Sequence, residues 1–218
     1  MRPPTGKAIL FDLLTALLDS WTAWNQAAGN EAAGRRWRAR YLELTYACGP
    51  YRPYEELVRE AGRDIGLNPG AADRLEFGWP DLQPWSGATE AVLALATSHP
   101  LGIVTNCSTR LGRLAAKCIP VDWQVIVTAE EAGYYKPHPR PYELALKQLG
   151  VSATHALFVA GSGYDLFGTT AVGLPTYWHN RVGLPLPHDA PAPDVEARDL
   201  TGLATWVNAH GAAQSVPR

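Results

Sequence analysis

The chain has 218 residues and a formal net charge of -2, a length that suits one α/β domain or a core domain with a small insertion. The near-neutral charge argues against a nucleic-acid partner, which requires a clustered basic face. No apolar run approaches the roughly 20 residues of a membrane helix, so we expect no membrane association.

The cysteines and the first residues suggest a cellular location. Cys48, Cys107 and Cys118 are an odd number without metal-ligand spacing, which is typical of free or buried thiols in a reducing compartment. The sequence before Asp12 has no signal-peptide pattern. We therefore expect a cytoplasmic protein.

The first predicted element is a short buried strand at residues 7–11, which ends abruptly at Asp12. The next region, about residues 21–82, has helical periodicity and no convincing strand. Residues 31–46 and 54–65 each carry an apolar stripe, and Asn68-Pro69 predicts the start of a further helix. We therefore predict an all-helical insertion, with the core at 1–19 and 84–218 and a helical cap at 20–83.

After Trp85 the pattern alternates between strand and helix. We expect strands at 102–104, 123–127, 156–160 and 176–178, and helices at 108–118, 140–149, 166–172 and 200–209. Residues 183–194, rich in Pro and Asp, predict a loop. The alternation predicts an α/β fold, a doubly wound parallel sheet of Rossmann-like type.

Four polar sites follow the predicted strands, and the carboxyl ends of parallel strands meet at one edge of a sheet. They are Asp12, Thr105-Asn106, Lys136 and Asp165. A single Asp after a strand often only starts a turn. Four polar sites in this order indicate a catalytic site.

The order and spacing of these sites resemble the haloacid dehalogenase superfamily. Its four motifs are matched by residues 11–20, Thr105-Asn106, Lys136-Pro137 and residues 158–165, with 173–176 beyond. The resemblance covers nearly the whole chain and implies that the helical insertion is the family's mobile cap, with Asp12 as the nucleophile. It is also compatible with a homodimer.

Two positions separate the possible chemistries. The phosphatases of this superfamily carry a second Asp two residues after the nucleophile and a magnesium-binding Asp in the fourth motif. These positions are Leu14 and Gly161 here. Phosphoryl transfer depends on a cation to neutralise charge, whereas a carbon–halogen bond has a good leaving group and needs only a carboxylate nucleophile. We therefore expect no metal and no cofactor.

The closest resemblance is to the 2-haloacid dehalogenases, which act on small organic acids. It implies that Lys136 keeps Asp12 charged, that Asp165 orients Lys136 and activates water, and that Arg38 in the cap faces the halogen. The resemblance further implies a substrate-binding role for a set of four residues: Leu14, Thr105, Asn106 and Tyr142.

Each of these residues also has a plain structural interpretation. Arg38 lies in a run of arginines and could simply face water, Lys136 could be a loop lysine, and Tyr142 could be a core aromatic. Thr105-Asn106 could cap the helix near residue 108, which is compatible with anion binding at a helix N-terminus. The histidines, including His179, have no metal-ligand spacing and are interpreted as surface or packing residues.

Two departures from the dehalogenase pattern remain. The usual Gly-Thr of the first motif is Thr15-Ala16, so the expected hydroxyl is missing at the second position, and Thr15 would supply one from the wrong place. The fourth motif carries Ala160 and Ser162 instead of the usual polar residues. The alternatives are thus a magnesium-dependent phosphatase of a small phosphate ester and a catalytically degraded binding protein.

Overall fold

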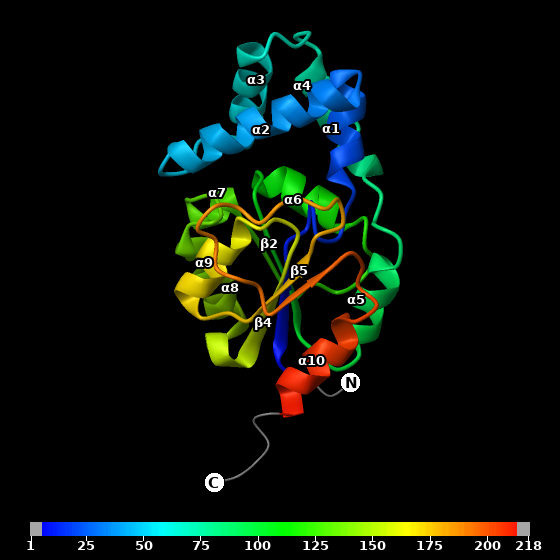
Figure 1. Cartoon of the computed structure of the whole chain (residues 1–218), viewed down its shortest axis with the longest axis vertical. Coiled ribbons are helices and arrows are strands. Elements are labelled where there is room, and N and C mark those ends of the chain that lie inside the picture. Colours follow the sequence, from blue (N-terminus) through cyan, green and yellow to red (C-terminus); the bar gives the residue numbers. More distant parts are fainter. Residues whose placement is uncertain (1–5, 213–218) are drawn as a thin grey trace.

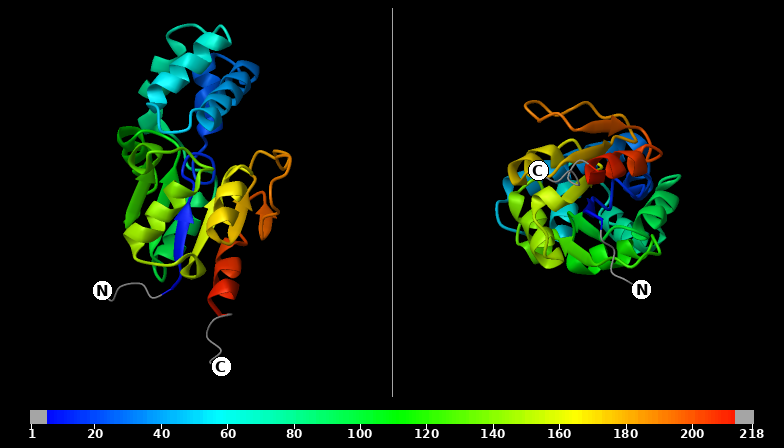
Figure 2. Two further views of the ribbon diagram at one scale, coloured as in Figure 1. Left: turned by 90° about the vertical axis from the view of Figure 1, so that its left-hand side faces the viewer. Right: turned by 90° about the horizontal axis from the view of Figure 1, so that it is seen from below.

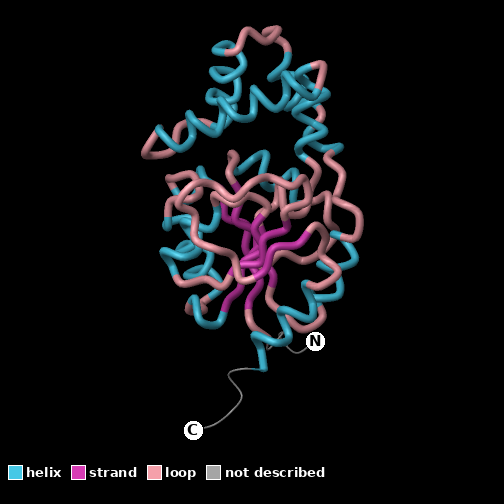
Figure 3. The backbone as a smooth tube through the Cα atoms, viewed as in Figure 1, coloured by secondary structure: helices cyan, strands magenta, loops and turns pink. Residues whose placement is uncertain are grey.

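The computed structural model describes residues 6–212, and its centre is a six-stranded parallel sheet in the order β3-β2-β1-β4-β5-β6 (Figures 1 and 3). The strands are β1 (Ala8–Phe11), β2 (Leu101–Thr105), β3 (Val125–Thr128), β4 (Ala156–Ala160), β5 (Thr176–His179) and β6 (Val195–Ala197). The chain winds outward in opposite directions from β1 and β4. Asp12, directly after β1, therefore lies at the switch point where parallel sheets bind ligands.

Alternation along the buried strands sends successive side chains into two separate cores. Ile9 and Phe11 belong to one core, with residues of α5 (Ala88–Ala96), α6 (Thr109–Ala116) and α10 (Leu203–Ala212). Leu10 belongs to the other core, with residues of α7 (Ala129–Ala132) and α8 (Pro139–Leu149), against which α9 (Asp165–Val172) packs. A short 3₁₀ helix, η2 (Ala153–His155), leads into β4. Helices thus cover both faces, as the predicted doubly wound fold requires.

A second layer of helices stands over the carboxyl ends of the strands (Figures 1 and 2). It consists of α1 (Ser20–Ala28), α2 (Glu31–Ala47), α3 (Tyr54–Asp64), α4 (Ala71–Phe77) and the 3₁₀ helix η1 (Trp79–Asp81). The two connections to the sheet lie together, because Leu18 forms an antiparallel bridge with Pro84 and the Asp19 amide donates to the Gln83 carbonyl at 2.8 Å. Asp19 also caps α1 by accepting from the Thr22 amide.

Several predicted boundaries differ from the structure. Asn68-Pro69 does not start a helix: the Asn68 side chain accepts from the Gly70 amide in a local turn, and α4 begins at Ala71. The strand expected from residue 123 begins at Val125, and the helix expected from residue 200 begins at Leu203. The edge strand β6 follows the expected loop and has only three residues, too few for a visible alternation. In the described part of the chain, none of the helices is both long and apolar enough to cross a membrane.

Candidate active site

Asp12 is nearly buried and its two carboxylate oxygens have different surroundings. Oδ2 accepts from the Thr15 amide at 2.8 Å, the Thr15 hydroxyl at 2.6 Å and the Ala16 amide at 3.0 Å. Among the described residues, Oδ1 accepts a single hydrogen bond, from Lys136 Nζ at 2.8 Å. One oxygen is therefore fixed by the loop after β1, and the other is the freer of the two.

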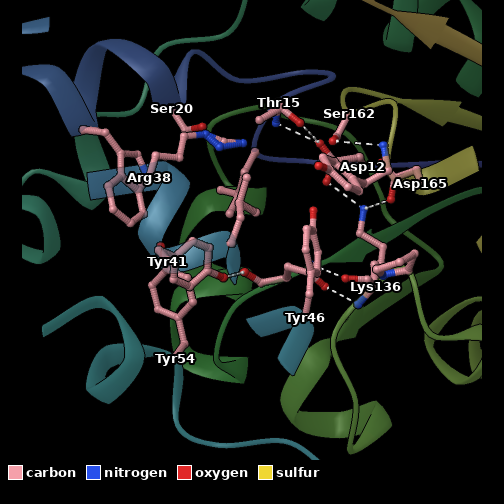
Figure 4. Close-up of a pocket in the computed structure, with 16 residues that line it drawn as sticks. Asp12, Thr15, Ser20, Arg38, Tyr41, Tyr46, Tyr54, Lys136, Ser162 and Asp165 are labelled. Atoms are coloured by element: carbon pink, nitrogen blue, oxygen red, sulfur yellow. Dashed lines mark hydrogen bonds and ion pairs between the residues drawn. The ribbon is translucent and has the colours of Figure 1, made fainter. Parts of the chain in front are cut away.

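Lys136 lies between two carboxylates in a buried network (Figure 4). Its Nζ is 2.8 Å from Asp12 Oδ1 and 3.0 Å from Asp165 Oδ1. Asn106 holds its backbone, since the amide nitrogen donates to the Lys136 carbonyl at 2.9 Å and the amide oxygen accepts from the Lys136 N–H at 2.7 Å. The Tyr142 hydroxyl donates to Asp165 Oδ1 at 2.8 Å. Segments that follow four strands thus meet around Lys136, with Asp12 and Asp165 at its ammonium and Asn106 at its backbone.

Burial and the shared ammonium move the pKa values of the two carboxyls in opposite directions. Burial opposes ionisation of Asp12, but Lys136 and the Thr15 donors outweigh it and hold the pKa of Asp12 below its ordinary value. Burial raises the pKa of Asp165 above its ordinary value, despite Lys136. Burial also disfavours charge on Lys136, yet the two carboxylates raise its pKa, so it remains an ammonium. Two carboxyls with separated pKa values suit different steps of one reaction.

The helical layer closes the site from the opposite side. Arg38 on α2 is 9% exposed, lies over the Trp21 ring with Cζ 4.2 Å from its centroid, and has a buried Nε without a partner. A cavity of about 50 Å³ separates Arg38 from the Asp12 network, far smaller than the roughly 300–1,000 Å³ of pockets for drug-sized ligands. Its walls add a set of mostly apolar and aromatic side chains: Leu14, Trp24, Tyr41, Leu42, Tyr46, Tyr54 and Tyr164. Only a small ligand fits.

The structure brings most of the predicted site residues to this cavity but not all of them. Asp12, Arg38, Lys136 and Asp165 line it, as do Leu14 and Asn106. Thr105 and Tyr142 are fully buried and are not among its lining residues. The Tyr142 side chain contacts Asp165 and the Asn106 amide is engaged by the Lys136 backbone, so substrate contact by Thr105, Asn106 and Tyr142 stays a prediction.

The loop after β1 answers the doubt about the missing hydroxyl. Ala16 has none, but the Thr15 hydroxyl reaches Asp12 Oδ2, so the expectation that it would act from the wrong place is incorrect. This arrangement depends on Gly161, because a Cβ there would lie 2.2 Å from Ala16 N and 2.3 Å from Thr15 Oγ1. The Thr15 hydroxyl therefore lies where a side chain at position 161 would have to lie. The sequence alone gives no signal of this contact.

Two other features have a more definite place in the structure than the sequence analysis gave them. His179 is almost fully buried, with Nδ1 2.7 Å from the Ala16 carbonyl, so it supports the loop behind Asp12. Tyr46 lines the cavity from α2. Its spacing of eight residues from Arg38, just over two helical turns, was the available signal that both lie on one side of that helix.

The residues present do not fit a magnesium site of the phosphatase type. Within residues 6–212, no three His, Cys, Asp or Glu side chains are grouped so that they could hold a metal ion. The position at which the phosphatases carry their fourth-motif Asp is Gly161, where even a Cβ would overlap the loop backbone. A carboxylate ligand therefore cannot be added there without displacing the nucleophile's loop.

Comparison with known proteins agrees with this geometry. The (S)-2-haloacid dehalogenase of Pseudomonas putida is 26% identical over 218 aligned residues, covering 92% of this chain and 96% of that protein. A crystal structure of a dehalogenase with an intermediate complex is 26% identical with a TM-score of 0.81, covering 94% of this chain and 98% of the other. The phosphoglycolate phosphatase of Yersinia pseudotuberculosis is 36% identical, but only over 105 residues and 45% of each chain.

The resemblance to dehalogenases thus extends over both the sheet and the helical layer, whereas the resemblance to the phosphatase is partial. A family model for haloacid dehalogenase-like hydrolases matches residues 3–171, which include Asp12, Arg38, Lys136 and Asp165. With this match over most of its length, the chain belongs to the haloacid dehalogenase-like hydrolase family.

Proposed function

We propose that this protein is a metal-independent hydrolase that releases halide from a small 2-haloacid through an ester intermediate on Asp12. The observation that carries the proposal is the asymmetry of the Asp12 carboxylate. Three donors hold Oδ2, whereas Oδ1 has only Lys136, so a lone pair on Oδ1 remains for attack on carbon. Asp12 stays ionised because its pKa is lowered, which is the state a nucleophile needs.

In the first step Oδ1 attacks the substrate carbon. The new C–O bond forms while the carbon–halogen bond breaks, and the halide leaves with the bonding electron pair. No proton is required, which agrees with Leu14 at the position where phosphatases carry an acid. Lys136 then no longer faces a full negative charge on Asp12, but it retains Asp165.

In the second step water hydrolyses the ester at Asp12 Cγ. Attack at Cγ places negative charge on Oδ2, where the Thr15 and Ala16 donors already lie at hydrogen-bond distance. The bond from Cγ to Oδ1 breaks, and Oδ1 departs as the alkoxide of the hydroxy acid, which takes a proton from Lys136 Nζ, 2.8 Å from Oδ1. The water oxygen replaces it in the Asp12 carboxyl group, whose remaining proton passes to Lys136, and Asp165 releases its proton to solvent. Asp165 is the base for this water, since its raised pKa favours proton uptake and no described donor engages its Oδ2.

The helical layer provides the second wall of the site. We propose that residues 20–83 act as a cap and residues 1–19 and 84–218 as the core. Arg38, a buried cation without a partner among the described residues, attracts the negative charge of the substrate and of the departing halide. The aromatic cap wall excludes bulk water from the first step.

The alternatives have less support. A magnesium-dependent phosphatase lacks the acid at Leu14 and has no room for a ligand at Gly161. A degraded binding protein would have no need of the buried network of Asp12, Lys136 and Asp165, since buried charges are costly unless they serve a purpose.

The test is halide release from 2-chloropropionate in water labelled with heavy oxygen. We expect release to persist with EDTA, and the hydroxy acid of a single turnover to carry unlabelled oxygen, because that oxygen comes from Asp12. Asp12→Asn should abolish release, by at least about 10⁴-fold. Loss of activity with EDTA, or labelled product in the first turnover, would exclude the mechanism. Magnesium-dependent release of phosphate from a small phosphate ester would favour the phosphatase instead.

A further inference from the structure

Tyr46 is a polar residue of the cap wall for which the mechanism above has no role. It lies near the end of α2, on the same helix as Arg38, and both line the cavity. Its ring packs against Tyr164, with centroids 4.8 Å apart, and its hydroxyl points toward Asp12 (Figure 4). The ring contact fixes the direction of the hydroxyl independently of any hydrogen bond.

The Tyr46 hydroxyl has no hydrogen-bond partner among the described residues. Neighbouring tyrosines are engaged, since Tyr41 donates to the Asn106 carbonyl at 3.2 Å and Tyr135 to the Arg52 carbonyl at 2.8 Å. Tyr142 is engaged with Asp165. Tyr46 is partly exposed and lines the cavity, so its hydroxyl is available to a ligand there.

The charges around Tyr46 determine what kind of partner it can serve. Burial raises the pKa of Tyr46 and Asp165 adds to this, although Arg38 opposes it. The phenol therefore keeps its proton wherever Asp12 is ionised, and acts as a neutral donor. With Arg38 it provides two donors on the wall opposite the nucleophile, an arrangement suited to an anion.

We propose that Tyr46 is a catalytic residue whose hydroxyl donates a hydrogen bond to the departing halide, beside Arg38; this rests on the function proposed above. Displacement at carbon requires the leaving group to depart on the side away from Asp12 Oδ1. That side is the cap wall, where neither Arg38 Nε nor the Tyr46 hydroxyl has a hydrogen-bond partner among the described residues. Tyr46 keeps its proton throughout, and the halide carries the electron pair of the broken bond.

The geometry favours the halide over the substrate carboxylate as the partner of Tyr46. The carboxylate lies beside the reacting carbon, off the line of attack, and is charged both before and after the step. The halide lies on that line and gains its charge only as the bond breaks. A donor opposite Asp12 therefore stabilises the transition state more than the bound substrate, which is the condition for raising kcat.

The test uses Tyr46→Phe, which retains the ring packed on Tyr164 and removes only the hydroxyl. Halide release in the first turnover is measured for 2-chloro-, 2-bromo- and 2-iodopropionate, so that ester hydrolysis does not mask the step. We expect about a tenfold or greater loss for chloride and a clearly smaller loss for iodide, which is less dependent on hydrogen bonding. Tyr134→Phe, outside the cavity, is the matched control and should leave all three rates unchanged.

A second measurement uses free chloride in place of a leaving halide. Chloride should inhibit the wild-type protein more strongly than Tyr46→Phe, because the hydroxyl contributes to holding the free anion. An equal loss for all three halides, a change confined to KM, or unchanged chloride inhibition would overturn the role of Tyr46. Absence of halide release from the wild-type protein would instead reject the proposed function itself.

Discussion

The cavity has two walls that hold their polar groups in different ways: a floor at the ends of the strands, with Asp12, Lys136 and Asp165, and a roof formed by the helical layer, with Arg38. On the floor, Asp12, Lys136 and Asp165 bond to one another and to the surrounding loops. On the roof, Arg38 is held by stacking on Trp21, and its buried Nε has no partner. The charged groups of the floor are therefore paired with one another, whereas the cation of the roof has no ion-pair partner among the described residues. Stability and function should respond differently to changes in the two walls.

Removing the ammonium of the floor should have the largest effect. Lys136→Met leaves the Asp12 and Asp165 carboxylates close together without a cation, so we expect a loss of about 3–5 kcal/mol in the free energy of unfolding. Activity should fall by about 10³-fold or more, because the pKa of Asp12 is no longer lowered by a neighbouring charge. Urea unfolding and halide release measure the two effects. Lys147→Met, at an exposed position of α8, is the control, and equal stability of both variants would contradict the account of the floor.

Removing the cation of the roof should separate activity from stability. Arg38→Met takes away a desolvated charge without a described ion-pair partner, so we expect activity to fall about 100-fold while stability is unchanged or rises by about 1 kcal/mol. Arg40→Met on the same helix, whose ion pairs with Glu43 and Asp64 are at the surface, should alter stability by less than about 1 kcal/mol and leave activity intact. A marked destabilisation by Arg38→Met would show that this residue is structural.

Filling the space between Thr15 and Gly161 should have a smaller effect on stability than removing Lys136. Gly161→Ala places a Cβ 2.2 Å from Ala16 N, so we expect a loss of about 1–3 kcal/mol and a shift of the donors on Asp12 Oδ2. Gly202→Ala is the control, because its Cβ would meet only Tyr177 Oη, at 3.7 Å. The two variants are compared by thermal unfolding and by the rate of ester hydrolysis. Wild-type behaviour of Gly161→Ala would mean that the loop moves aside freely.

The pH dependence should sharpen the division of roles between the two carboxyls. Ester formation needs ionised Asp12, whose pKa is lowered, and ester hydrolysis needs ionised Asp165, whose pKa is raised. As the pH falls, hydrolysis should therefore fail first, and the ester should accumulate. Single-turnover and steady-state rates, measured over the acidic range, check the order. If the single-turnover and steady-state rates fell over the same pH range, the assignment of Asp165 as the base would be contradicted.

The sequence predicted most of the fold because β1, β2, β4 and β5 are short, fully buried and largely apolar strands. It did not predict β6, a partly exposed edge strand whose pairing with β5 is a tertiary contact. It also did not predict where α4 starts, because the hydrogen bond from the Gly70 amide to the Asn68 side chain competes with capping of a helix by Asn68.

The candidate site was predictable to the level of strand ends but not to the level of side-chain direction. Asp12, Lys136 and Asp165 meet as their order implied. The inward or outward orientation of Thr105 and Tyr142 depends on how each element is rotated in the packed molecule, which spacing does not reveal. The hydroxyl of Thr15 was misjudged for the same reason: one residue's shift along a tight loop is compensated by the absence of a side chain at Gly161.

The bridge between Leu18 and Pro84 has a consequence for how the molecule can change. The chain leaves the sheet and returns to it at this one paired point, and residues 20–83 also contact the rest of the molecule elsewhere, as in the bridge between Pro50 and Tyr134. Exchanging that segment for another should alter the ligand-facing wall, whereas the donors on Asp12 Oδ2 come from Thr15 and Ala16, outside the segment. Evolution or an engineer could thus vary the choice of substrate through one segment while the reaction stays on the other.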